Sequence, residues 1–294
     1  MKELRSKHEE ADTRIVFHAN YIGTHCHGDL NTLVVQSCDT DIFVLLLYHQ
    51  NYVNAKVWMD TGTSSKNTRR MINVVELAQV LISPVCSALP AFHAFTGSDY
   101  TTAFLRKAKA RPYNFMIKNP KYLSAFTELG TSESVVPEVL AIIEDYVCSM
   151  HGVHGETDVN ITRFRLFKKL YAPKNLHCPL GKIKSTDPCC LPLCKDVVQQ
   201  KVKRTNYVAQ IWRNARAANP ITYSPDGHVW KITDKNLLEI VWFEGLQNPT
   251  SLFSVIAEDI SISEQEEEED DGENISYSLS SDEEEDDHDC DDDD

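Results

Sequence analysis

The amino-acid sequence predicts an α/β protein with a parallel sheet and flanking helices, followed by a helical region, a small β hairpin and a disordered acidic tail. Three observations support this fold class. Short apolar runs alternate with helical patterns in residues 1–112. Apolar residues recur at spacings of three and four farther along, and acidic side chains dominate the last part of the chain.

The first part of the chain predicts helices and strands in alternation. A helix is expected over residues 6–19, where acidic residues precede an apolar stripe. Residues 31–37 and 56–59 are short and apolar, so we expect them to form two strands of a parallel sheet. Apolar residues at helical spacing predict further helices over residues 70–81 and 84–95.

The remaining chain predicts helices, a loop and a hairpin. Residues 134–150 and 159–171 are amphipathic, and residues 172–195 contain four prolines, as expected of a loop. A basic helix is expected over residues 196–218, and a turn at residues 233–236 between two apolar runs predicts a hairpin. We therefore divide the chain into residues 1–112, 113–195, 196–257 and 258–294.

Charge is distributed unevenly along the 294 residues, which carry 29 basic and 44 acidic side chains and a net charge of −15. Residues 258–294 contain 21 of the acids and no Lys or Arg, which leaves residues 1–257 with a net charge of about +6. A mildly basic body tolerates polyanions. The tail is expected to bind the basic body or basic proteins, or only to keep the chain soluble.

Several protein classes are excluded by composition. The longest apolar run, residues 42–48, is too short to span a bilayer, so we expect no membrane partner. The N-terminus has no apolar signal region, and nine irregularly spaced Cys indicate a reducing compartment. We therefore expect an intracellular protein, in the nucleus rather than the cytoplasm.

Three acidic groups, Glu9-Glu10-Ala11-Asp12, Asp39-Thr40-Asp41 and Gly97-Ser98-Asp99, stand out in the first part of the chain. Hard cations such as Mg²⁺ prefer oxygen ligands, and acids at the ends of buried elements are costly unless they are paired or metal-bound. Asp39 and Asp41 follow a predicted strand, and Asp60 occupies a similar position. The alternative is that these acids are solvated surface residues.

The ordered motifs E-A-D, V-V-Q-S-C-D-T-D and T-G-S-D-Y within residues 8–112 resemble those of the flap-endonuclease/XPG-like branch of PIN-domain nucleases. This resemblance implies a partial PIN-like, Rossmann-like sheet. The stretches H-E-E-A-D-T, L-P-A-F-H-A-F-T-G-S-D-Y-T-T-A-F and K-R-T-N-Y-V-A-Q-I-W, spread over residues 8–256, are also similar to a group of uncharacterised animal proteins, many associated with mobile elements.

The nuclease resemblance implies specific roles for the acids. Glu10 and Asp12 match the first acidic pair of the family, Asp39 and Asp41 the second, and Asp99 the last acid. All five are implied ligands of Mg²⁺ or Mn²⁺, and the last three are the implied catalytic residues. Helical spacing leaves Glu9 as a rival to Glu10, because residues three apart share a helix face and residues two apart do not.

Two departures from the family pattern bear on activity. The family has an earlier strand and further acids that have no counterpart here, so we expect weak or no cleavage by this chain. The family also has a glycine-rich hairpin that approaches DNA phosphates after the last acid. Here the segment is basic, and four side chains could hold phosphate instead or simply be exposed: Arg106, Lys107, Lys109 and Arg111.

Other candidate residues admit plainer interpretations. His93 either orients an active-site group or is a hydrogen-bonded core residue. The bases of the 196–218 helix either contact nucleic acid or form a solvated face beside an apolar stripe. A group near residues 177–194 has zinc-ligand chemistry but no zinc-site spacing, so we favour loop thiols over zinc: His177, Cys178, Cys189, Cys190 and Cys194.

The sequence thus predicts a Mg²⁺-dependent, structure-specific nuclease-like protein that acts on nucleic-acid phosphodiesters, DNA rather than RNA. The alternative is a non-catalytic nucleic-acid or chromatin interaction protein, domesticated from a mobile element.

Overall fold

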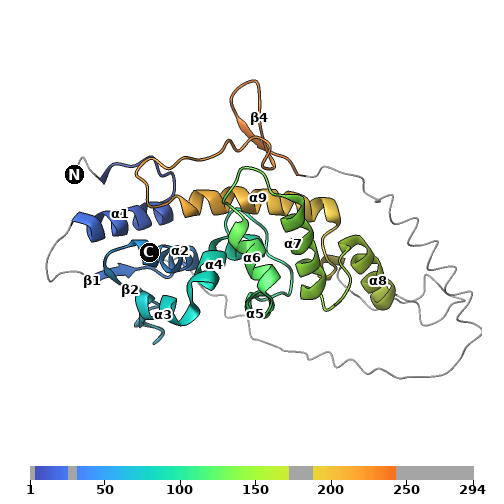
Figure 1. Ribbon diagram of the computed structural model, residues 1–294, viewed down its shortest axis with the longest axis horizontal. Helices are drawn as coiled ribbons and strands as arrows, with labels where there is room; N and C mark the ends of the chain where they lie inside the picture. The colour runs from blue at the N-terminus through green and yellow to red at the C-terminus, as the bar shows by residue number, and fades with distance from the viewer. Residues whose placement is uncertain (1–3, 26–31, 172–187, 243–294) are drawn as a thin grey trace, which may run out of the picture. The chain divides into compact units, whose positions relative to one another are not determined.

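The computed structural model describes residues 4–25, 32–171 and 188–242, which are coloured in Figure 1. All of them belong to one unit, Met1–Leu252. The acidic tail lies outside the described residues. Within this part of the chain, no single helix is long and apolar enough to cross a membrane, although the sharply bent pair formed by residues 74–81 and 83–96 passes such a test by length and composition.

A three-stranded mixed sheet lies near the N-terminal helix (Figure 1). Strands β1 (Thr32–Gln36) and β2 (Lys56–Thr61) are parallel, which confirms the two predicted strands. Strand β3 (Arg70–Asn73) is antiparallel to β2, so the sheet is mixed and not wholly parallel as predicted. Along β1 more buried residues alternate with exposed ones, and Val35 of β1 is buried beside Met59 of β2.

Nine α-helices and a hairpin complete the described chain. The helices are α1 (Ala11–His25), α2 (Thr40–His49), α3 (Val74–Leu81), α4 (Ser83–Thr96), α5 (Ala110–Lys118), α6 (Pro120–Glu128), α7 (Pro137–Met150), α8 (Val159–Tyr171) and α9 (Lys195–Arg213). Short 3₁₀ turns lie at Gln50–Tyr52 and Pro188–Cys190. The hairpin pairs β4 (Trp230–Ile232) with β5 (Leu238–Ile240) and confirms the predicted turn.

Two of the predicted helices have different boundaries in the structure. The helix expected over residues 70–81 begins only at Val74, because Arg70–Asn73 is a strand and the Asn73 side chain caps the helix by accepting from the N–H of Glu76. The first helix begins at Ala11 and ends at His25, so Glu9 and Glu10 lie before the helix and Asp12 is the acid in its first turn.

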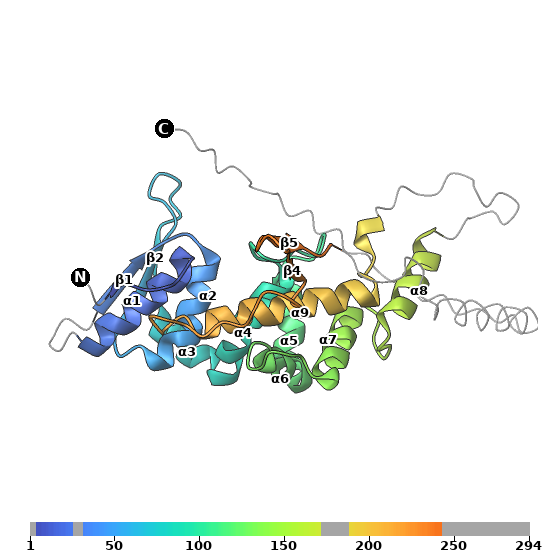
Figure 2. The same ribbon diagram turned by 90° about the horizontal axis from the view of Figure 1, so that it is seen from above.

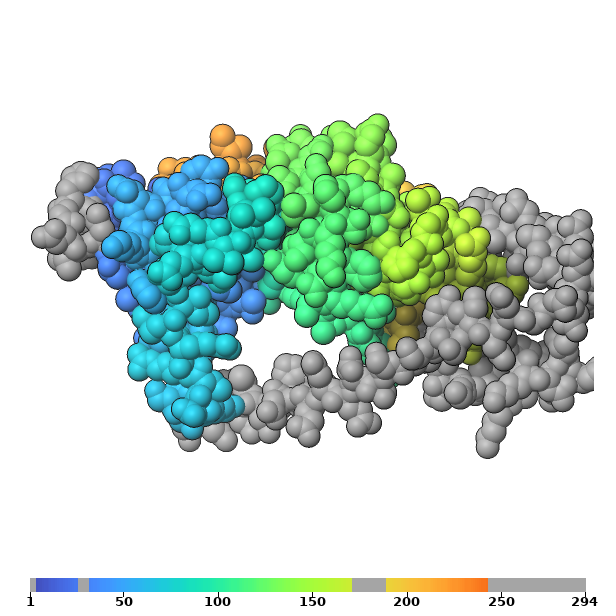
Figure 3. All heavy atoms as spheres, turned by 60° about the horizontal axis from the view of Figure 1, so that its bottom comes forward, coloured from blue at the N-terminus to red at the C-terminus, as the bar shows by residue number. Residues whose placement is uncertain are grey.

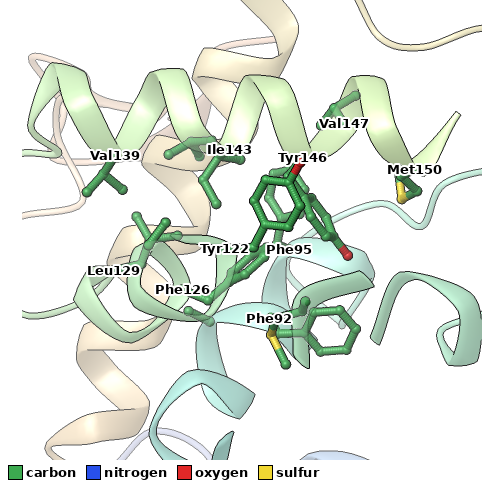
Figure 4. Packing of buried hydrophobic residues seen from close by; sticks show 14 of the residues in the cluster. Phe92, Phe95, Tyr122, Phe126, Leu129, Val139, Ile143, Tyr146, Val147 and Met150 are labelled. Carbon is green, nitrogen blue, oxygen red and sulfur yellow. The ribbon is translucent and has the colours of Figure 1, made fainter. Parts of the chain in front are cut away.

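The largest cluster of buried apolar residues joins α4, α6 and α7 (Figure 4). Phe95, Phe126 and Tyr146 are fully buried, and the rings of Phe126 and Tyr146 meet edge to face at 5.1 Å. Helices α6, α7 and α8 contribute to the continuous green to yellow-green surface in Figure 3. The cluster fixes α4, which ends beside the candidate site described below.

Helix α9 runs along α4 and also contacts α2 and α7 (Figure 2). Its predicted apolar stripe is confirmed, since Val198, Val202 and Trp212 are buried. Two of the basic residues of α9 do not belong to the solvated face considered for this helix. The ammonium of Lys201 is buried against the Thr102 carbonyl, and Arg213 donates to the carbonyls of the α4 residue Ser87 and of the α6 residue Thr127.

Candidate metal centre

Three carboxylates converge where α1 and α2 lie side by side. Asp12 is in the first turn of α1, Asp39 caps α2, and Asp41 is in the first turn of α2. Each offers one oxygen atom, and the three oxygens lie within 4.8 Å of one another. Three carboxylate oxygens at this spacing suit a hard divalent cation.

The loop that follows β1 sets the direction of Asp39 and Asp41. The backbone N–H of Asp39 donates to Oγ of Ser37 at 3.0 Å, and Oδ1 of Asp39 accepts from the backbone N–H of Asp41 at 2.9 Å. This N-cap begins α2 directly after the carboxyl end of β1, at the edge where ligands gather in sheets with parallel strands. The apolar side chains of residues 42–47 then anchor α2 in the protein interior.

Glu10 and Asp99 lie close enough to this group to interact with it electrostatically. Burial and the charges of Asp12, Asp41 and Asp99 raise the pKa of Glu10 to about 7. Burial and the charges of Asp39, Asp41 and Asp99 raise the pKa of Asp12 to about 6. The five acids predicted from the sequence are therefore gathered in one region of the molecule, although Asp39 and Asp99 remain exposed.

The structure favours Glu10 over Glu9 as a member of this acidic group. Glu10 is half-buried and interacts with Asp12, Asp41 and Asp99, whereas Glu9 is exposed. The helical spacing that made Glu9 a rival does not apply, because α1 begins at Ala11 and Glu10 precedes it.

A buried tryptophan from the far part of the chain also reaches Glu10. The indole N–H of Trp212 partly offsets the rise in the pKa of Glu10. The two groups do not form an ordinary hydrogen bond, and Nε1 of Trp212 has no hydrogen-bond partner among the described residues. Trp212 is only 1% exposed and is fixed through its carbonyl, which lies 2.8 Å from Nε2 of the α2 residue His49. Sequence reasoning gave Trp212 no part in this site.

His93 is buried and contacts the acidic group directly. Its Nε2 atom lies 2.6 Å from Oδ1 of Asp41, and its Nδ1 atom lies 2.9 Å from the ammonium of Lys109. The same ammonium donates to the carbonyl of Gly97 at 2.6 Å, two residues before Asp99. His93 thus orients a candidate ligand, one of the two roles considered for it, with Asp41 and not Asp99 as its partner.

Asp60 is the acid near a strand end that does not join the group. It is 7% exposed and accepts two hydrogen bonds from Arg69, at 2.9 and 2.7 Å. This pairing lowers the pKa of Asp60. A carboxylate held by both oxygens in this way is engaged in structure and not available to a cation.

The four predicted phosphate-binding side chains fall into two classes. Arg106 and Arg111 are exposed, whereas Lys107 and Lys109 are half-buried, and the Lys109 ammonium already has partners in His93 and Gly97. Burial lowers the pKa of Lys109, and the charge of Asp41 partly offsets this effect. Arg106 has φ of +53°, the backbone region that favours glycine.

The possible zinc ligands are only partly described. His177 and Cys178 lie outside the described residues, as does the acidic tail. Cys189 is exposed, Cys190 and Cys194 carry free thiols, and Cys194 is the N-cap residue of α9.

The donor set fits a hard cation better than a soft one, because every candidate ligand atom is a carboxylate oxygen. When compared with protein-family models, curated proteins and solved structures, the chain matches none of them.

Proposed function

We propose that the chain is a divalent-cation-dependent hydrolase of nucleic-acid phosphodiesters, of the flap-endonuclease-like type. The observation that carries this proposal is the convergence of the Asp12, Asp39 and Asp41 oxygens within 4.8 Å, with Glu10 and Asp99 near enough to repel them. Repelling carboxylates that are partly withdrawn from water are costly unless a cation or protons neutralise them.

The side chains have separable tasks in this proposal. Asp12, Asp39 and Asp41 would hold Mg²⁺ or Mn²⁺, and Glu10 and Asp99 would complete the negative environment. The bound cation would supply an activated water and stabilise negative charge on the phosphate oxygens. His93 fixes the rotamer of Asp41 through Oδ1, which leaves the second oxygen of this carboxylate free to bind.

A basic segment beside the acids supports a polyanionic substrate. Lys109 donates to the carbonyl of Gly97, so this segment is tied to the loop that carries Asp99. Arg106 and Arg111 are exposed, and guanidinium groups bind phosphate oxygens well. We assign DNA rather than RNA as the substrate, as an extension of the resemblance to flap endonucleases. We expect slow cleavage, because only three of the five acids bring their oxygens within 4.8 Å of one another.

The test is a titration of Mg²⁺ and of Mn²⁺ with a flapped DNA substrate. The double change Asp39→Asn/Asp41→Asn is preferable to alanine, because Asn also caps helices and preserves the start of α2. Asp234→Asn, an exposed site in the hairpin turn, is the matched control. Cleavage that requires metal, disappears in the double variant and persists in the control supports the hydrolase.

The same experiment tests the non-catalytic alternative. The exposed Arg106 and Arg111 would suffice for nucleic-acid binding without any chemistry. No cleavage by wild type, together with salt-sensitive DNA binding that the double change leaves unaltered, would favour an interaction protein and reject the hydrolase.

A further inference from the structure

A pocket of about 320 Å³ borders the acidic group and shares Glu10 with it. This volume is at the small end of the range for ligand sites, and it suits one nucleoside and not a larger cofactor. The residues that decide its chemistry come from the N-terminal segment, the loop after α4, α9 and the segment that follows α9: Glu9, Glu10, Tyr100, Tyr207, Ile211 and Thr222.

The apolar walls of the pocket are fixed by packing behind them. Tyr100 and Ile211 pack against the buried cluster that contains Trp212. The Tyr207 ring lies 5.4 Å from the ring of His228 and 5.3 Å from that of Trp230, centroid to centroid. Tyrosine side chains held in this way offer a preorganised aromatic surface on which a flat ring can stack.

The polar side of the pocket carries two carboxylates beside the ammonium of Lys7 and the buried ring of His8, whose Nε2 atom lies 2.8 Å from the carbonyl of Ala217. Glu9 and Glu10 both line it, and Glu10 also interacts with the acids of the candidate metal centre. The two carboxylates outnumber the single ammonium of Lys7, so the pocket disfavours a phosphate group. They accept hydrogen bonds from exocyclic amino groups of bases, as Glu and Asp do with cytosine.

We propose that this pocket binds one unpaired nucleobase with an exocyclic amino group, from the strand whose phosphate lies at the acidic group. This inference rests on the proposed function, because the shared Glu10 side chain is what places the pocket next to the reacting phosphate. The base stacks between aromatic walls and donates to the glutamates, while its phosphates stay outside near the cation. The pocket thereby selects single-stranded or flapped nucleic acid over continuous duplex, in which bases are not free to enter.

A binding experiment tests this site without requiring cleavage. The probe is a short single-stranded oligothymidylate with one 2-aminopurine, a fluorescent base that carries an amino group and is quenched when it stacks. The titration is carried out with the full chain, once in Ca²⁺ and once in EDTA. We expect quenching with wild type, and a loss of affinity of about fivefold or more with Tyr100→Ala.

Two further variants keep the test decisive. Thr222→Trp places a bulky ring at an exposed pocket residue and leaves the tyrosines in place, so it is expected to block quenching even if Tyr100→Ala unfolds. Tyr52→Ala, at an exposed tyrosine that does not line the pocket, is the matched control and is expected to bind as wild type does.

The outcomes separate this inference from the proposed hydrolase. Quenching that Thr222→Trp abolishes, in a chain that shows no metal-dependent cleavage, supports the base pocket and rejects the hydrolase. Metal-dependent cleavage with quenching unchanged in Thr222→Trp overturns the pocket. Absence of quenching together with binding of a trimethyllysine peptide also overturns it, because an acidic aromatic pocket of this kind would then recognise a cationic side chain.

Discussion

Nε2 of His93 lies 2.6 Å from Oδ1 of Asp41, although 52 positions separate the two residues in the chain. The Lys109 ammonium, 2.9 Å from Nδ1 of the same ring, has only hydrogens to offer, so Nδ1 accepts and Nε2 donates to Asp41. A neutral histidine in this tautomer orients a carboxylate without neutralising it. The row of three side chains therefore prepares Asp41 to bind a cation.

Loss of the lysine at the end of this row is expected to weaken cation binding. Lys109→Met removes the donor to Nδ1 and to the Gly97 carbonyl, which frees the histidine to change tautomer and loosens the loop of Asp99. We expect the dissociation constant for Mn²⁺ to rise about tenfold, as is usual when a partner of a metal ligand is removed, measured by titration calorimetry. Lys107→Met, two residues away, is the control. Equal effects of the two changes would assign Lys109 a purely electrostatic role.

The raised pKa of Glu10 predicts a pH-dependent penalty on the metal-free fold. Its pKa is about 7 in the folded protein and about 4.3 in an unfolded chain, so between these values the folded state binds more protons. Stability therefore falls as pH rises from about 4 to 7 and is then level. Glu10→Gln removes this loss, and we expect it to raise the free energy of unfolding at pH 8 by on the order of 1 kcal/mol, after allowance for solvent screening.

Urea unfolding at pH 5 and pH 8 in EDTA checks this expectation. The gain from Glu10→Gln should be larger at pH 8 than at pH 5, because the unfavourable charge is complete only above the folded pKa. Glu9→Gln alters the exposed neighbour and should give no comparable pH-dependent gain. A gain that is the same at both pH values would mean that Glu10 does not meet the other acids in solution.

Local patterns in the sequence predicted several elements well. The helix expected over residues 84–95 is observed as Ser83–Thr96, and that expected over residues 159–171 is Val159–Tyr171. Both have apolar residues at helical spacing and clear ends. The apolar pattern of residues 70–81 continued across the strand Arg70–Asn73, and only the capping chemistry of Asn73 marks the true start of the helix.

The candidate site was predictable only where its residues form local motifs. The acids of E-A-D, D-T-D and G-S-D are recognisable as motifs, and the structure gathers them in one region. The contact of Trp212 with Glu10 depends on how α9 packs against α2 and α4, and no local pattern contains that information. For the same reason the sequence offers Lys109 either as a phosphate contact or as an exposed base, whereas tertiary packing turns its ammonium toward His93.

The two exposed arginines of the basic segment are expected to dominate its contribution to nucleic-acid binding. Arg106→Gln/Arg111→Gln should weaken binding and reduce the slope of log affinity against log salt by about 1 to 2, because each phosphate contact releases counterions. Gln at position 106 keeps a side chain at φ of +53°, so the backbone cost does not change. Fluorescence anisotropy from low to moderate salt measures the slope.

The control for this pair is Arg70→Gln/Arg165→Gln, at two exposed arginine sites in β3 and α8. It removes the same net charge from other parts of the chain. An identical change in slope for both double variants would show that overall charge, and not the basic segment, determines affinity. Mn²⁺ affinity should remain unchanged in both.

Gly130 lies against the backbone of α9, so a substitution there shows whether the packing of α9 maintains the candidate site. Its φ is +82°, its N–H donates to Oδ1 of Asn206 at 2.7 Å, and a Cβ atom there would lie 2.7 Å from the backbone carbon of Ala209. Gly152 has φ of +84° and nothing within 4 Å of such a Cβ. Alanine at either position therefore carries the same backbone strain of about 1 to 2 kcal/mol, and only Gly130→Ala adds a clash with α9.

We expect Gly130→Ala to lower the free energy of unfolding by about 3 kcal/mol or more, against about 1 kcal/mol for Gly152→Ala, in urea titrations followed by circular dichroism. Since Trp212 lies on α9, one turn beyond Ala209, displacement of this helix should also shift the tryptophan fluorescence and withdraw the indole from Glu10. Equal losses of unfolding free energy for the two alanine variants would mean that α9 can move away from residue 130 without destabilising the protein. Its packing would then not position the indole.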